Sequence, residues 1–84
     1  MTNKEILKKQ IIYRSTHRGS KEMDILLGNF AKKYVDKFTD DDLKKLDKLL
    51  KIEDEILYQW YFKKNKSETV PNNKISELLK KFRL

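Results

Sequence analysis

Apolar side chains recur along this sequence every three or four residues, which is the spacing of one face of an α-helix. The longest stretch with this spacing lies between residues 20 and 38, and a shorter one lies between residues 43 and 50. Only two Gly and one Pro interrupt the 84 residues, whereas Leu, Lys and Glu are abundant. The pattern therefore predicts an all-α fold.

Good helix-capping residues divide the chain into five short helices. Ser20 and Thr39 are suited to cap the second and third helices, and Asn72 or Asn73 is suited to cap the last. The Asp40–Asp42 run favours a helix start, because carboxylates interact well with the positive end of the helix dipole. We interpret this run as structural rather than as a catalytic carboxylate pair. The expected helices cover residues 3–15, 20–38, 39–50, 53–62 and 72–82.

Each expected helix carries one apolar face, and together these faces predict a single five-helix bundle over residues 1–84. Gly28 lies inside the second helix, where we expect it to permit a close helix crossing. Gly19 lies in the first break, where it is free to adopt a positive φ. The expected apolar positions are Ile6, Leu7, Ile11, Met23, Leu26, Leu27, Phe30, Tyr34, Phe38, Leu43, Leu46, Leu49, Leu50, Ile56, Leu57, Trp60, Tyr61, Ile75, Leu78, Leu79 and Phe82.

The composition argues against an enzyme. The chain has no Cys and one His, so neither a Cys–His pair nor a thiolate metal site can be built. No Gly-rich loop is present to hold a phosphate, and no apolar run reaches the length of a membrane-spanning helix. We expect no tightly bound cofactor, no metal and no membrane insertion.

The net charge of +7 raises nucleic acid as a partner. The charge is divided into about +5 for residues 1–21, −3 for residues 22–62 and +5 for residues 63–84. Only three of the basic residues are Arg, the side chain best suited to bidentate recognition of bases and phosphates. We favour a solvated Lys surface and expect no nucleic acid. A small basic nucleic-acid-binding or antitoxin-like regulatory module stays open as the alternative.

An aromatic group in the fourth helix points to a protein partner. Tyr58, Trp60, Tyr61 and Phe62 fall within five residues, so they cannot all face inward on one helix. At least one of Tyr58 and Tyr61 is expected to be partly exposed, where an amphipathic ring suits a protein interface.

The most informative motif is Arg18-Gly19-x-x-Glu22, which falls in the break after the first helix. Met23, Asp24 and Phe30 follow it, and the Tyr58-x-Trp60 pair lies further on. This arrangement resembles the succinate dehydrogenase assembly factor family, whose members promote flavinylation and carry an Arg-Gly-x-x-Glu motif between the first two of five helices. Members often have an acidic residue just before the aromatics of the fourth helix. Here Ile56 stands at that place, and the acidic run 53–55 precedes it.

The resemblance implies a chaperone-like assembly factor that has no catalytic activity of its own. Its expected partner is the flavoprotein subunit of succinate dehydrogenase, and also that of fumarate reductase, and FAD becomes attached to that partner. The factor would be a monomer when free. It would act in the bacterial cytoplasm, or in the mitochondrial matrix if a eukaryotic presequence has been removed.

The resemblance also implies a partner-binding site. Arg18 is expected to project from the break toward the partner, with Gly19 allowing close backbone approach. Glu22 would bind the partner or orient Arg18. The alternative is a local Arg18–Glu22 ion pair, worth only about 0.3–0.5 kcal/mol. The further residues expected at this site are His17, Asp24 and Tyr58.

Overall fold

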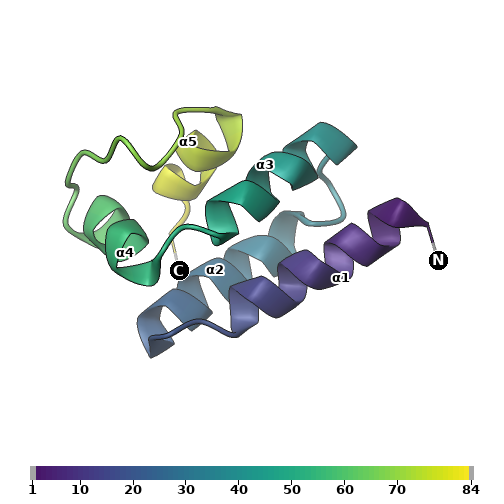
Figure 1. Ribbon diagram of the computed structural model, residues 1–84, viewed down its shortest axis with the longest axis horizontal. Coiled ribbons are helices and arrows are strands. Elements are labelled where there is room, and N and C mark those ends of the chain that lie inside the picture. The colour runs from purple at the N-terminus through teal and green to yellow at the C-terminus, as the bar shows by residue number, and fades with distance from the viewer. Residues whose placement is uncertain (1, 84) are drawn as a thin grey trace.

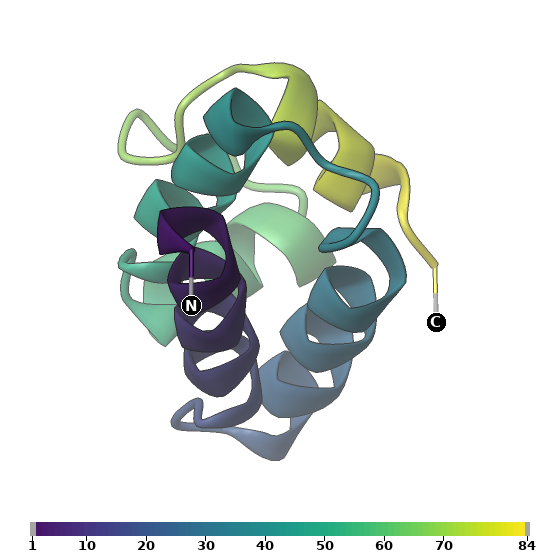
Figure 2. The ribbon, with the colours of Figure 1, turned by 90° about the vertical axis from the view of Figure 1, so that its right-hand side faces the viewer.

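The computed structural model, which describes residues 2–83, is an α-helical bundle. Its helices are α1 (Asn3–Thr16), α2 (Lys21–Tyr34), α3 (Asp40–Leu50), α4 (Asp54–Phe62) and α5 (Lys74–Lys81). The helices α1 and α2 lie side by side as a hairpin, α3 packs on α1, and α5 packs on α3 (Figures 1 and 2). The all-α prediction and the five expected helices are confirmed.

The predicted caps explain where the helices begin. The Ser20 hydroxyl accepts a hydrogen bond from the Met23 amide and so starts α2. Thr39 and Asp42 form a reciprocal capping box at the start of α3, as the acidic run predicted. Of the two candidates at the start of α5, Asn73 is the cap, because its side chain accepts from the amides of the first turn.

The predicted second helix is too long at its C-terminal end. The helix α2 ends at Tyr34, and residues 35–37 form a turn. Phe38 nevertheless joins the core, because its amide still donates to the Tyr34 carbonyl and its ring stacks on that of Tyr34 at 5.5 Å. The turn therefore keeps the spacing of the apolar stripe although the regular helix has ended.

The core is formed largely by the apolar faces that the spacing predicted, although the prediction wrongly included Ile6 and missed Ala31, Val35 and the loop residue Val70. Ile11 is fully buried and Leu7 is half-buried, but Ile6 is 40% exposed. In this helix only one narrow stripe faces α2 and α3, so the residue next to Leu7 points outward. The buried apolar side chains are Ile11, Met23, Leu26, Leu27, Phe30, Ala31, Val35, Phe38, Leu43, Leu46, Leu49, Leu50, Leu57, Trp60, Tyr61, Val70, Ile75 and Leu79.

Gly28 provides the close approach that was expected between the first two helices. A Cβ atom built on Gly28 would lie 3.3 Å from the Thr16 side-chain methyl and 3.7 Å from the Ser15 carbonyl oxygen. The C-terminal end of α1 thus rests against the backbone of α2. This contact fixes where the chain leaves α1 and enters the segment that carries the Arg18-Gly19-x-x-Glu22 motif.

Within residues 2–83, no helix combines the length and apolar character that crossing a membrane requires. The same residues contain no group of three or more His, Cys, Asp or Glu side chains arranged to hold a metal ion.

Candidate partner-binding site

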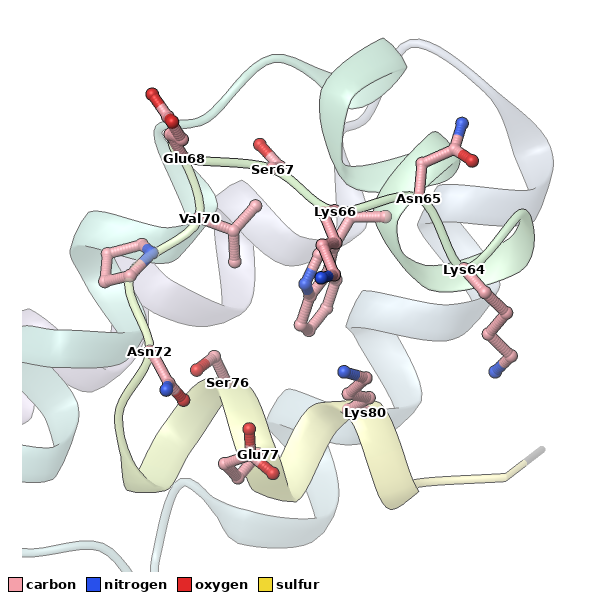
Figure 3. A pocket seen from close by; sticks show the side chains of 12 residues that line it. Lys64, Asn65, Lys66, Ser67, Glu68, Val70, Asn72, Ser76, Glu77 and Lys80 are labelled. Carbon is pink, nitrogen blue, oxygen red and sulfur yellow. The ribbon is translucent and has the colours of Figure 1, made fainter.

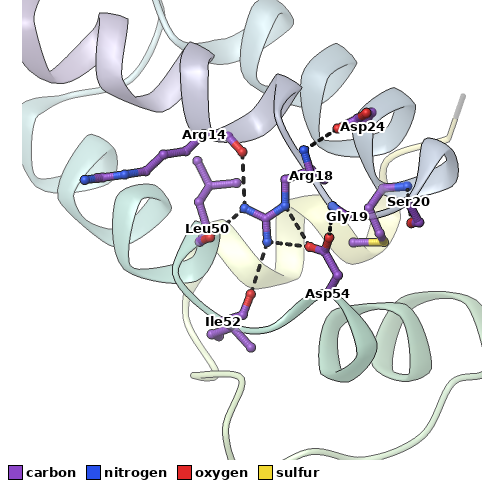
Figure 4. A network of polar contacts seen from close by, with 9 residues as sticks. Arg14, Arg18, Gly19, Ser20, Asp24, Leu50, Ile52 and Asp54 are labelled. Atoms are coloured by element: carbon purple, nitrogen blue, oxygen red, sulfur yellow. Dashed lines mark hydrogen bonds and ion pairs between the residues drawn. The ribbon is translucent and has the colours of Figure 1, made fainter.

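Two turns meet at one end of the bundle and form the candidate site. The first turn joins α1 to α2 and carries Arg18 and Gly19, and the second joins α3 to α4 and ends at Asp54. Figure 4 shows the Arg18 side chain pointing from the first turn into the second. Residues more than 30 positions apart in sequence are therefore brought together here.

The Arg18 guanidinium is buried and makes four hydrogen bonds and an ion pair. Its side chain is only 9% exposed. The Nε atom lies 2.7 Å and the Nη2 atom 2.6 Å from Oδ1 of Asp54. The remaining contacts are to backbone carbonyl oxygens: those of Arg14 at 3.2 Å, Leu50 at 2.6 Å and Ile52 at 3.1 Å.

These contacts correct two expectations about Arg18. The side chain does not project from the break, because the ends of α1 and α3 present carbonyl oxygens that attract a guanidinium. The ion pair formed by Arg18 is with Asp54 rather than with Glu22. No local spacing rule predicts this pairing, because Asp54 lies 36 residues further along the chain.

Asp54 binds both residues of the first turn. Its Oδ1 atom contacts the Arg18 guanidinium, while its Oδ2 atom accepts a hydrogen bond from the Gly19 backbone amide. The Arg18 backbone amide in turn donates to the Asp24 side chain in α2. The turn before α2 is thus held from both sides by carboxylates.

Gly19 does not use its freedom to adopt a positive φ. Its need for a small residue is steric instead, because a Cβ atom at this position would lie 3.2 Å from Oδ2 of Asp54. The Asp54 carboxylate approaches the Gly19 amide so closely that little room is left for a side chain.

A groove of about 430 Å³ lies beside these turns. Glu22 lies on its α2 side, and Tyr58 lies on its α4 side and is partly exposed, as expected for one of the two tyrosines. Tyr61 is buried, and its hydroxyl donates to the Phe82 carbonyl. The residues lining the groove are Gly19, Ser20, Glu22, Asp54, Glu55 and Tyr58.

The structure therefore brings three of the six expected site residues to the groove: Gly19, Glu22 and Tyr58. Arg18 and Asp24 lie behind it and hold the turn. His17 faces another part of the surface, where its ring stacks on Tyr13 with the ring centres 3.9 Å apart.

Sequence reasoning missed Asp54 and Glu55 as members of the site. The available signal was the acidic run at the start of the fourth helix, which the family resemblance already marked as a relevant position. It could not be connected to Arg18 from sequence, because the pairing depends on how α3 and α4 return to the end of α1.

A second groove, of about 540 Å³, lies between α4, α5 and the loop that joins them. Figure 3 shows Lys64, Lys66 and Lys80 around it, with Ser76 and Glu77 on the α5 side. The buried Trp60 also lines this groove.

Comparison with known proteins places the chain in a family. Residues 9–83 match the family model described as the flavinator of succinate dehydrogenase. The chain belongs to this family. The match includes both turns and the whole groove, and it confirms the family resemblance drawn from the sequence.

Individual relatives agree with this family. The chain is 42% identical over 82 residues to a protein of Candida glabrata and 40% identical over 77 residues to one of Scheffersomyces stipitis. A protein of Saccharomyces cerevisiae is 37% identical over 87 residues. All three are named succinate dehydrogenase assembly factor 2, mitochondrial. The alignments cover 90–96% of this chain but only 52–54% of each relative, so the chain spans about half the length of these proteins.

Proposed function

We propose that this chain is an assembly factor that binds the flavoprotein subunit of succinate dehydrogenase and promotes covalent attachment of FAD to that subunit. The observation that carries the proposal is the match of residues 9–83 to the succinate dehydrogenase flavinator family. The proposal extends to the flavoprotein subunit of fumarate reductase. The factor acts as a monomer in the compartment where the flavoprotein folds, which is the matrix in a mitochondrion and the cytoplasm in a bacterium.

The proposed mechanism is conformational, and the chain itself is not an enzyme. Covalent attachment requires the flavin and the accepting side chain of the partner to be aligned, and alignment alone lowers a barrier by several kcal/mol. A small bundle favours the aligned state if it binds that arrangement of the partner better than others. The chain needs no tightly bound FAD for this role.

The groove is the proposed contact surface on this chain. Glu22 is exposed and makes no ion pair within residues 2–83, so its carboxylate is available to a partner. Tyr58 offers a partly exposed amphipathic ring on the opposite wall. Gly19 lets the partner backbone come close to the turn between them. His17 extends the contact surface beyond the groove.

Flavin attachment to the partner tests the proposal. The flavoprotein subunit is co-expressed with the wild-type chain, with Glu22→Gln or with Glu77→Gln, and covalent flavin is measured by fluorescence in a denaturing gel. Glu77 is the matched control, because it is also an exposed Glu in the first turn of a helix but lies away from the groove. We expect Glu22→Gln to reduce covalent flavin strongly and Glu77→Gln to leave it unchanged. Equal flavin with and without the wild-type chain would refute the proposed function.

A further inference from the structure

We propose that Asp54 is a positioning residue of the partner-binding groove and that it acts through Arg18 and the Gly19 amide rather than by touching the partner. The inference rests on the proposed function, and it assigns the Arg18 side chain to the interior of the factor. Asp54 and Arg18 would then form an internal clamp, defined here as the contacts of these two side chains with each other and with the Gly19 amide.

The Arg18 guanidinium is turned toward groups of its own chain, which leaves little of it for a partner. A guanidinium has five N–H donors. Its Nε and Nη2 atoms contact Asp54, and Nη1 and Nη2 donate to the backbone carbonyl oxygens of Arg14, Leu50 and Ile52. Four of these contacts are hydrogen bonds, and the fifth is the ion-pair contact between Nη2 and the Asp54 carboxylate. A partner could bind the Arg18 side chain only by displacing one of these buried bonds, at the cost of an unsatisfied group.

Asp54 connects this buried cation to the surface of the groove. One carboxylate oxygen contacts Arg18, and the other accepts from the Gly19 amide, which forms part of the groove. Gly19 is followed directly by Ser20, the N-cap of α2. The position of Asp54 thus determines where α2 begins and where the first turn of that helix presents Glu22.

A second Arg–Asp ion pair that joins α1 to a distant segment lies outside the groove. Arg14 pairs with Asp47 and connects α1 to α3, with the Asp47 side chain 15% exposed, against 23% for Asp54. Neither Arg14 nor Asp47 lines the groove. The two pairs start four residues apart in sequence, and each connects the first helix or its end to a distant segment. The Arg14 side chain is more exposed than that of Arg18, at 38% against 9%, so the second pair is a control for the connection between helices but not for burial of the Arg.

The test compares four variants of the full chain: Asp54→Asn and Arg18→Lys at the clamp, with Asp47→Asn and Arg14→Lys as controls. Binding to the purified flavoprotein subunit is measured by titration at a temperature below the melting point of every variant, and folding is checked by circular dichroism. Amide hydrogen exchange of Gly19 is measured in the free chain.

We expect both clamp variants to raise the Kd for the flavoprotein by about tenfold or more, and both controls to change it by less than about threefold. Gly19 amide exchange should accelerate in the clamp variants alone. Arg18 does not line the groove, so weaker binding by Arg18→Lys would report positioning and not a lost contact.

Two results would overturn the inference while leaving the proposed function intact. If Asp54→Asn weakens binding but Arg18→Lys does not, Asp54 contacts the partner directly. If the clamp variants bind as tightly as the controls, the clamp stabilises the fold only. A wild-type chain that binds no flavoprotein would instead refute the proposed function itself.

Discussion

Several single residues in this molecule stabilise the fold by connecting helix ends through polar contacts. Arg18 shows this most clearly, because its buried guanidinium contacts the end of α1, the end of α3 and the start of α4. Asp42 has a similar role at the start of α3, where it completes the capping box with Thr39 and pairs with Lys74 of α5 at 3.3 Å. Such residues affect stability more than their position in a turn or first helical turn suggests.

Replacement of Arg18 by Ala should destabilise the chain by about 2–4 kcal/mol, because it removes the cation beside Oδ1 of Asp54 and the donors to three carbonyl oxygens. This differs from the small change expected of an exposed Arg. Thermal unfolding followed by circular dichroism measures the effect. Arg83→Ala is the control, since Arg83 is exposed and bonds only to carbonyls of its own segment, and it should change stability by less than about 0.5 kcal/mol.

Asp42 makes stability depend on acidic pH. Burial disfavours its charged form, but hydrogen bonds from Thr39 and Lys74 outweigh burial, so that the pKa of Asp42 lies below its ordinary value of 3.8. A lowered folded-state pKa contributes stability above the unfolded value, and that stability is lost as the pH falls through the folded value.

The unfolding free energy of wild type should therefore exceed that of Asp42→Asn at pH 6, and the gap should narrow as the pH falls below about 4. Urea titrations at a series of pH values measure this difference in unfolding free energy. At pH 7 the neighbouring Asp41→Asn should change stability by only a few tenths of a kcal/mol, because Asp41 is exposed and its partner is Lys45 at 3.0 Å in the same helix. A constant gap between wild type and Asp42→Asn from pH 6 to pH 2 would contradict the assigned role of Asp42.

The helices of the bundle are positioned by close contact with a neighbouring backbone as well as by the packing of apolar faces. The α1–α2 hairpin depends on Gly28, against which Thr16 and Ser15 of α1 rest. The hairpin in turn sets the direction in which the chain enters the turn at Gly19. The interior of α2 and the candidate site at its N-terminus are therefore connected through the packing of these two helices.

Replacement of Gly28 by Val should destabilise the hairpin by about 1–3 kcal/mol, because even a Cβ atom would lie 3.3 Å from the Thr16 methyl. Asn29→Val is the control, since Asn29 is the exposed neighbour in the same helix and reports the intrinsic cost of Val alone. Chemical denaturation of both variants gives the difference. Equal stability losses would show that the helix contact at Gly28 tolerates a side chain.

The molecule as a whole is small, with a radius of gyration of 12.0 Å and extents of 38 × 25 × 20 Å. A chain of this size buries only about 60% of the surface that it exposes when unfolded, and its core is thin. The two grooves described above lie on the surface between helices and loops. Sites that bind a small molecule tightly usually bury most of the ligand.

We therefore predict that the purified chain binds free FAD weakly, with a Kd far above about 1 μM. Isothermal titration with FAD measures the affinity, and the absorbance spectrum of the purified chain shows whether flavin stays bound. A sub-micromolar Kd, or a yellow protein after purification, would contradict this prediction and would suggest that the factor delivers the cofactor itself.

The sequence could predict the helices because their causes are local. Apolar spacing, the caps Ser20 and Thr39, and the acidic start of α3 each act within one helical turn. The end of α2 was misjudged, because the apolar spacing continues through the turn to Phe38 although the regular helix stops at Tyr34. The motif at Arg18 was recognised from sequence through its resemblance to a family.

The tertiary structure alone decided what Arg18 and Gly19 do. Asp54 lies 36 residues beyond Arg18, and no local rule connects a residue in one turn with a carboxylate in another. The contact exists because α3 and α4 bring the chain back to the end of α1. There Arg18 donates to carbonyl oxygens at the helix ends, and Asp54 accepts from the Gly19 amide. Helix formation is determined within a few residues, whereas a buried charge finds its partner only after the helices have packed.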